Sequence, residues 1–125
     1  MNNTSDKMVL ICDDEPHIRE SIRYAVEKEG YASMMVGDGI AAYETACSEK
    51  PDLVILDVGM PGMTGYEVCK KLRATQDVEN ILILVLTAFG QATDEVDATN
   101  AGANHFMSKP FSPRELRAKL NEILG

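Results

Sequence analysis

The chain has 125 residues, of which 45% are hydrophobic and 26% charged, a composition typical of one folded domain and too apolar for a disordered chain. Its 12 basic and 20 acidic residues give a formal net charge of −8, so we expect no direct binding to nucleic acid. No apolar stretch approaches the ~20 residues that cross a bilayer, and the N-terminus has no secretory pattern. Residues 1–125 are therefore expected to form one cytoplasmic domain without membrane contact.

Short apolar runs recur along the chain and predict strands. They cover residues 8–12, 32–36, 53–56, 81–86 and 105–107. The first, third and fourth runs are apolar without alternation, which is typical of strands covered on both faces. We therefore expect these three strands at the centre of a sheet.

The segments between the runs predict helices. One apolar stripe at helical spacing begins at Ile18 and another at Leu116. The sequence Ser112-Pro113-Arg114-Glu115 is a capping box with proline at the first helical position, which predicts the start of the last helix. Alternating strands and helices indicate an α/β fold, a doubly wound three-layer sandwich with a parallel sheet. A ligand site is then expected at the carboxyl ends of the strands.

Charged and polar residues follow the strands at those ends. Asp13 and Asp14 follow the first strand, Asp57 the third, Thr87 the fourth and Lys109 the fifth. Clustered carboxylates raise one another's pKa, so they require a cation nearby. An ammonium group supplies one positive charge, and Mg²⁺, which prefers carboxylate and phosphate oxygens, would supply the rest. This set of groups suits phosphoryl transfer, in which positioning and charge neutralisation dominate.

With these residues the chain resembles the receiver domains of two-component response regulators, a family in which chemotaxis receivers are single-domain members. The match runs from residue 8 to residue 124. It also includes Met60-Pro61-Gly62-Met63-Thr64-Gly65 after the third strand, Thr87-Ala88 and Lys109-Pro110. The resemblance implies a five-stranded, flavodoxin-like sheet with strand order 2-1-3-4-5.

The resemblance also implies a phosphorylation site and a metal site. Asp57 would be the phosphoacceptor. Asp14, Asp57 and the backbone carbonyl of Gly59 would bind Mg²⁺ directly, and Asp13 would hold a water molecule on the metal. The implied function is that of a phosphorylation-activated switch that takes its phosphoryl group from a sensor histidine kinase or a histidine phosphotransfer protein.

A switching mechanism is implied in the same way. Thr87 and Lys109 would bind phosphoryl oxygens, and Phe106 would be the aromatic residue that moves with Thr87. The Lys109–Pro110 bond would be cis. Phosphorylation would then change the surface formed by the fourth helix, the fifth strand and the fifth helix. The domain would catalyse only its own phosphorylation and dephosphorylation.

The sequence leaves the output partner open. Between Arg73 and Lys109 the chain has five acidic residues and no lysine or arginine, whereas the last helix carries Arg114, Arg117 and Lys119. Such a surface fits an output protein or effector domain of mixed charge, and it also fits a second copy of the chain. Two solvated faces without a partner would have the same charge pattern. A monomer and a phosphorylation-promoted homodimer therefore both remain open, as does the choice between a single-domain regulator and the receiver of a longer protein.

Hydrolysis of the phosphorylated state depends on two further positions. The resemblance places Gly59 and Phe89 beside the path of the attacking water. Neither side chain can orient that water by hydrogen bonding. Since positioning a nucleophile lowers the barrier to reaction, we expect slow intrinsic loss of the phosphoryl group.

Other functions fit the sequence less well. The segment Gly37-Asp38-Gly39-Ile40-Ala41-Ala42 matches a dinucleotide-binding pattern, but it follows the second strand rather than the first strand of a βαβ pair. A receiver-like adaptor that needs no phosphorylation would be expected to lose the acidic pair, the acceptor or the lysine, and all are present. An aspartyl phosphatase needs a second acid two residues after the acceptor, where this chain has glycine.

Overall fold

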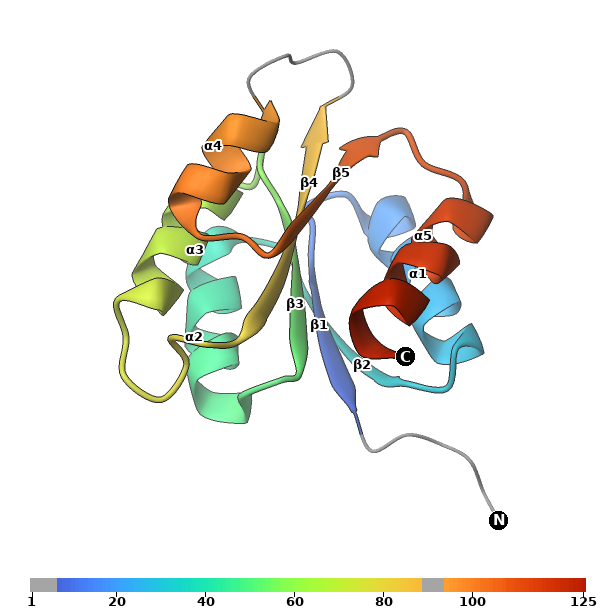
Figure 1. The fold of residues 1–125 in the computed structure, drawn as a ribbon, viewed down its shortest axis with the longest axis horizontal. Helices are drawn as coiled ribbons and strands as arrows, with labels where there is room; N and C mark the ends of the chain where they lie inside the picture. The colour runs from blue at the N-terminus through green and yellow to red at the C-terminus, as the bar shows by residue number, and fades with distance from the viewer. Residues whose placement is uncertain (1–6, 89–93) are drawn as a thin grey trace.

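A central parallel sheet lies between two layers of helices in the computed structural model, which describes residues 7–88 and 94–125 (Figure 1). Strands and helices alternate along the chain. The elements are β1 (Met8–Cys12), α1 (Pro16–Lys28), β2 (Ala32–Val36), α2 (Gly39–Glu49), β3 (Leu53–Asp57), α3 (Gly65–Arg73), β4 (Leu82–Ala88), α4 (Asp94–Ala101), β5 (His105–Lys109) and α5 (Pro113–Leu124).

The strand order is β2-β1-β3-β4-β5, and every neighbouring pair is parallel. The doubly wound α/β sandwich with order 2-1-3-4-5 is therefore confirmed. The strands expected at the centre, β1, β3 and β4, lie there. β4 extends past the predicted run, because Thr87 and Ala88 continue the ladder opposite Ser108 and Lys109.

Each face of the sheet has its own hydrophobic core, because neighbouring residues of a strand point to opposite faces. In β1, Leu10 packs into the core beneath α2, α3 and α4, whereas Val9 and Ile11 pack into the core beneath α1 and α5. All three side chains are fully buried. Figure 1 shows the two helical layers on opposite sides of the sheet.

Capping boxes begin two of the described helices. The Ser112 hydroxyl accepts the Glu115 N–H at 3.0 Å and the Glu115 carboxylate accepts the Ser112 N–H at 2.8 Å, as the sequence predicts. Thr64 and Glu67 form the same reciprocal pair at the start of α3. The sequence analysis missed this second box, although Thr64-Gly65-Tyr66-Glu67 carries its pattern. A cap of this kind contributes about 1 kcal/mol and here determines where the segment after β3 ends.

The helices in the described part of the chain are too short and too polar for any of them to span a bilayer. α1, for example, has 13 residues, against the ~20 that a membrane span requires.

Candidate functional site

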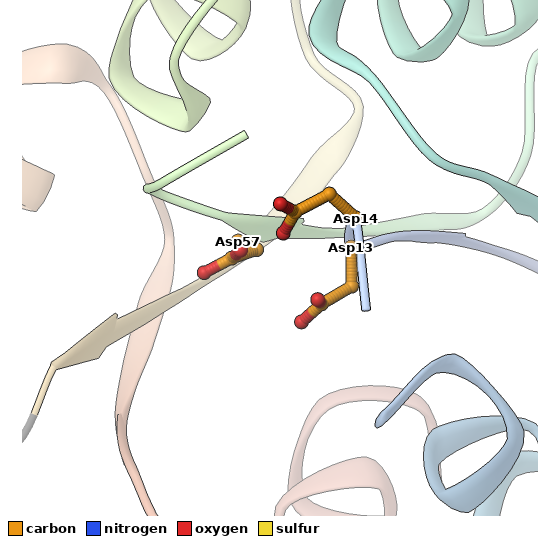
Figure 2. Close-up of side chains that lie close together, drawn as sticks. All are labelled: Asp13, Asp14 and Asp57. Atoms are coloured by element: carbon orange, nitrogen blue, oxygen red, sulfur yellow. The ribbon is translucent and has the colours of Figure 1, made fainter. Parts of the chain in front are cut away.

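Carboxylates from the ends of β1 and β3 meet at one edge of the sheet. Asp13, Asp14 and Asp57 each offer a carboxylate oxygen, and these oxygens all lie within 4.8 Å of one another (Figure 2). β1 and β3 are adjacent and parallel, with Cys12 paired to Leu56, so the residues that follow each strand emerge at the same place. The expected clustering of these acids is confirmed.

The three carboxylates differ in burial. Asp13 is completely buried and Asp57 is 8% exposed, whereas Asp14 is exposed. Asp13 is held on both sides, since its carboxylate accepts the Glu15 N–H at 3.0 Å and its own N–H donates to the Val36 carbonyl at 3.2 Å. The cluster is therefore closed on the Asp13 side and open to solvent on the Asp14 side.

Lys109 reaches this cluster from β5, which is separated from β3 by β4. Its ammonium nitrogen lies 2.9 Å from Asp13 Oδ2 and 3.1 Å from Asp57 Oδ1. The following Lys109–Pro110 peptide bond is cis, as expected. The lysine thus places one positive charge between two of the three carboxylates.

Burial and neighbouring charges shift the pKa values of two groups in this site. Burial raises the pKa of the Asp57 carboxyl; hydrogen bonding to Lys109 opposes the rise and the charge of Asp13 adds to it. Burial lowers the pKa of Lys109, but hydrogen bonds to Asp13 and Asp57 together with the charges of these carboxylates outweigh burial and leave the pKa raised. Burial is thus the main cause of the rise at Asp57, and the two carboxylate partners are the cause of the rise at Lys109. Three carboxylates beside one ammonium group leave an excess of negative charge, which would stabilise a further cation.

Thr87 and Phe106 lie on neighbouring strands and share a face of the sheet. Phe106 pairs with Val85, and Thr87 lies two residues beyond Val85, so their side chains point the same way. Thr87 is 2% exposed, and its hydroxyl donates to the Met107 carbonyl at 3.5 Å. That distance is at the outer limit for a hydrogen bond, so the bond is weak. Phe106 is partly buried against the core beneath α4.

Gly59 lies beside the expected acceptor. Its backbone N–H donates to the Asp57 carboxylate, and the residue is exposed. A Cβ atom added at this position would be 4.0 Å from Asp57 Oδ2, and beyond its chain neighbours no other atom of residues 7–88 and 94–125 comes within 4 Å. A side chain at position 59 would therefore begin beside the Asp57 carboxylate. Phe89, the second residue expected to flank the attacking water, lies outside the described residues.

The sequence analysis missed Arg19. This residue lies in the first turns of α1, and its Nη1 donates to the backbone carbonyl of Asp13 at 2.7 Å. Arg19 thus binds the peptide group that joins Asp13 to Asp14, and its guanidinium contacts the backbone there. No pattern in the sequence distinguishes this arginine from an ordinary charged residue on a helix.

Comparison with known proteins identifies related sequences. The family model for the response regulator receiver domain matches residues 9–121. The chain is 43% identical over 119 residues to the alkaline phosphatase synthesis transcriptional regulatory protein PhoP of Bacillus subtilis, covering 95% of this chain and 49% of that protein. It is 40% identical over 116 residues to the response regulator MprA of Mycobacterium ulcerans, covering 93% of this chain and 49% of that protein. The chain thus spans about half the length of these curated relatives.

Solved structures are similar over nearly the whole chain. The chemotaxis response regulator CheY4 of Vibrio cholerae matches with a TM-score of 0.89 and 31% identity, covering 96% of this chain and 100% of CheY4. The receiver domain of the sensor histidine kinase PA1611 of Pseudomonas aeruginosa matches with a TM-score of 0.85 and 28% identity, covering 95% of this chain and 98% of that domain. That structure contains a magnesium ion coordinated in its active site cleft. With its parallel sheet, its acidic cluster and these relatives, the chain belongs to the response regulator receiver domains of two-component systems.

Proposed function

We propose that Asp57 takes a phosphoryl group from a sensor histidine kinase or a histidine phosphotransfer protein in a reaction that requires Mg²⁺. The observation that carries this proposal is the placement of Asp57 between a lysine ammonium at 3.1 Å and two further carboxylates. One ammonium group cannot balance these acids. The domain acts as a catalyst only on its own phosphorylation and dephosphorylation, and we propose a cytoplasmic location.

The residues of the cluster fit Mg²⁺. Mg²⁺ binds proteins through one or two carboxylates and keeps water or phosphate oxygens at its other positions. Asp14 and Asp57, with the backbone carbonyl of Gly59, would hold the metal, and Asp13 would hold one of its water molecules. When bound, the metal supplies positive charge beside the transferring phosphoryl group.

The chemistry assigns a role to each remaining group. A carboxylate oxygen of Asp57 forms a bond to phosphorus while the phosphorus–nitrogen bond of the donor phosphohistidine breaks, and the electron pair and a proton go to the imidazole. The nucleophile must be ionised, and Lys109 favours that form against the effect of burial. Lys109 also lies where it can neutralise phosphoryl oxygens.

The switch uses Thr87 and Phe106. The new phosphoryl group adds a charge of about −1.5 to −2 close to the end of β4. The Thr87 hydroxyl gives up only its weak hydrogen bond to the Met107 carbonyl, at 3.5 Å, when it turns to the phosphoryl oxygens. Phe106, on the same face of the sheet, then fills the space that Thr87 leaves. This movement changes the surface formed by α4, β5 and α5.

That surface would bind the output partner. Val96 of α4 is 58% exposed, and Arg114 of α5 is exposed. Arg117 already forms an ion pair within the domain, since its Nε lies 2.6 Å from Glu29 Oε2. An output protein, an effector domain and a second copy of this chain all remain candidates. PhoP is a transcriptional regulatory protein, which makes transcription one candidate output.

Phosphorylation can be tested by intact-mass measurement after treatment with acetyl phosphate. We expect one added phosphoryl group with Mg²⁺, and none with EDTA or in Asp57→Asn. Asp52→Asn is the matched control, because Asp52 precedes the same strand at the opposite edge of the sheet. Labelling that persists in Asp57→Asn, or that is lost in Asp52→Asn, would contradict the assignment of the acceptor.

A further inference from the structure

Residues 37–39, the start of the dinucleotide-like glycine pattern, contact the segment that follows β3. Asp38 caps α2 by accepting the Ala41 N–H at 2.8 Å, and Gly39 is the first residue of the helix. Gly39 is buried. Its N–H donates to the Pro61 carbonyl at 3.1 Å, so the start of α2 is joined to the segment that follows β3.

Gly39 lies too close to that segment for any side chain. A Cβ atom at position 39 would be 1.9 Å from the Met63 carbonyl oxygen and 2.6 Å from both the Met63 carbonyl carbon and Cβ. Two of these three atoms belong to the backbone, which cannot rotate away as the end of a flexible side chain can. Any residue other than glycine must therefore displace either α2 or the backbone at Met63.

The segment from residue 58 to residue 64, which we call the acceptor loop, is held at its other end by a second close contact. The Gly65 N–H donates to the Val58 carbonyl at 3.1 Å. A Cβ atom at position 65 would be 2.6 Å from the Asp57 carbonyl oxygen. The acceptor loop is thus joined at Val58 to the start of α3 and at Pro61 and Met63 to the start of α2, and Gly59 lies between Val58 and Pro61.

We propose that Gly39 is a positioning residue for the acceptor loop, which it holds so that the backbone at Gly59 stays beside the Asp57 carboxylate. The inference rests on the proposed Mg²⁺-dependent function, because the Gly59 carbonyl is one of the proposed metal ligands. The inference also explains the glycine at position 39 without a bound nucleotide. The absence of a side chain there lets α2 lie against the backbone of Met63.

The test compares two glycine-to-alanine variants by NMR and Mg²⁺ titration. Gly39→Ala should change the backbone amide shifts of residues 58–65 in the metal-free protein and raise the Mg²⁺ dissociation constant about tenfold, the scale of effect seen when the supports of metal ligands are removed. Gly30→Ala is the control. Gly30 has a positive φ of 91°, and among the residues that the structure describes none beyond its chain neighbours comes within 4 Å of an added Cβ, so this variant is strained without touching the loop.

The outcomes separate positioning from general destabilisation. If Gly39→Ala binds Mg²⁺ as tightly as Gly30→Ala does, the inference is wrong. If Gly39→Ala does not fold, Ile40→Ala decides, because the Ile40 side chain approaches Gly62 in the loop and is 50% exposed. A weakened Mg²⁺ affinity in that variant supports the inference, and an unchanged affinity overturns it. If the wild type does not bind Mg²⁺, the proposed function fails, and the amide shifts of the metal-free variants still test the positioning.

Discussion

Lys109 and Asp13 are 96 residues apart in the sequence, yet the lysine Nζ lies 2.9 Å from the Asp13 carboxylate. Asp13 has no exposed side-chain surface, and the lysine side chain is 22% exposed. The contact connects the end of β5 to the end of β1 across two intervening strands. A buried carboxylate without such a partner would be left with an uncompensated charge.

Lys109→Met should therefore destabilise the metal-free protein. Removing one partner of a fully buried ion pair costs ~3–5 kcal/mol, and because Lys109 is partly exposed we expect a loss of about 1–3 kcal/mol. Urea unfolding at pH 7 measures this loss. Lys70→Met on the exposed face of α3 is the control and should change stability by less than ~0.5 kcal/mol. Equal losses in both variants would show that the Asp13 contact contributes nothing.

Asp57→Asn should change how stability depends on pH. Burial raises the pKa of the Asp57 carboxyl, so the native state binds this proton more tightly than the unfolded chain does. As pH rises from the ordinary aspartate value of 3.8 through the raised native pKa, the wild type loses free energy of unfolding that the variant retains. Urea unfolding across this interval without metal should give a more negative slope for the wild type. Equal slopes would contradict the direction of this shift.

Mg²⁺ should stabilise the native state through the acidic cluster. A ligand that binds only the native state adds about 2.7 kcal/mol at a concentration 100 times its dissociation constant. Thermal unfolding with and without Mg²⁺ should show this gain in the wild type and in Asp52→Ala. Asp14→Ala, which removes an exposed carboxylate of the cluster, should lose most of the gain. A full gain in Asp14→Ala would remove this residue from the proposed metal ligands.

Thr87→Ala should separate phosphorylation from switching. Without the hydroxyl, no group from β4 can bond to the phosphoryl oxygens, so binding of a phosphoryl mimic no longer triggers a movement of Phe106. With beryllofluoride as the phosphoryl mimic, the NMR shifts of Phe106 should change in the wild type and in Thr87→Ser. They should stay near their unliganded values in Thr87→Ala. Wild-type shift changes at Phe106 in Thr87→Ala would rule out this coupling.

Gly59→Asn combined with Phe89→Glu should shorten the life of the phosphorylated protein. An added Cβ at position 59 would be 4.0 Å from Asp57 Oδ2, so a polar side chain there could orient water beside this carboxylate. Decay is followed by intact mass at fixed Mg²⁺ after acetyl phosphate is removed, with each single variant alongside. Equal or slower decay in the double variant would show that neither position controls the attacking water.

The sequence by itself was sufficient wherever the deciding interactions are local or repetitive. The central residues of β1, β3 and β4 are buried, which requires apolar residues on both faces, and that requirement is visible in the runs themselves. The Ser112 cap depends on a residue three positions away, and the Thr64 cap was equally open to prediction. The strand order could be predicted only from the family resemblance. The spacing of apolar residues in a strand indicates which face of the sheet a side chain occupies, but it does not indicate which strands are neighbours.

Only the tertiary structure decided which groups touch within the site. Asp13 and Asp14 are adjacent and chemically identical, yet one is buried against Lys109 and the other faces solvent, because the direction of the chain at the end of β1 separates them. The contact of Gly39 with Met63 joins segments from two crossovers, and no pattern within either segment encodes their distance. Such contacts depend on how helices pack against the sheet, so they exist only once the chain has folded.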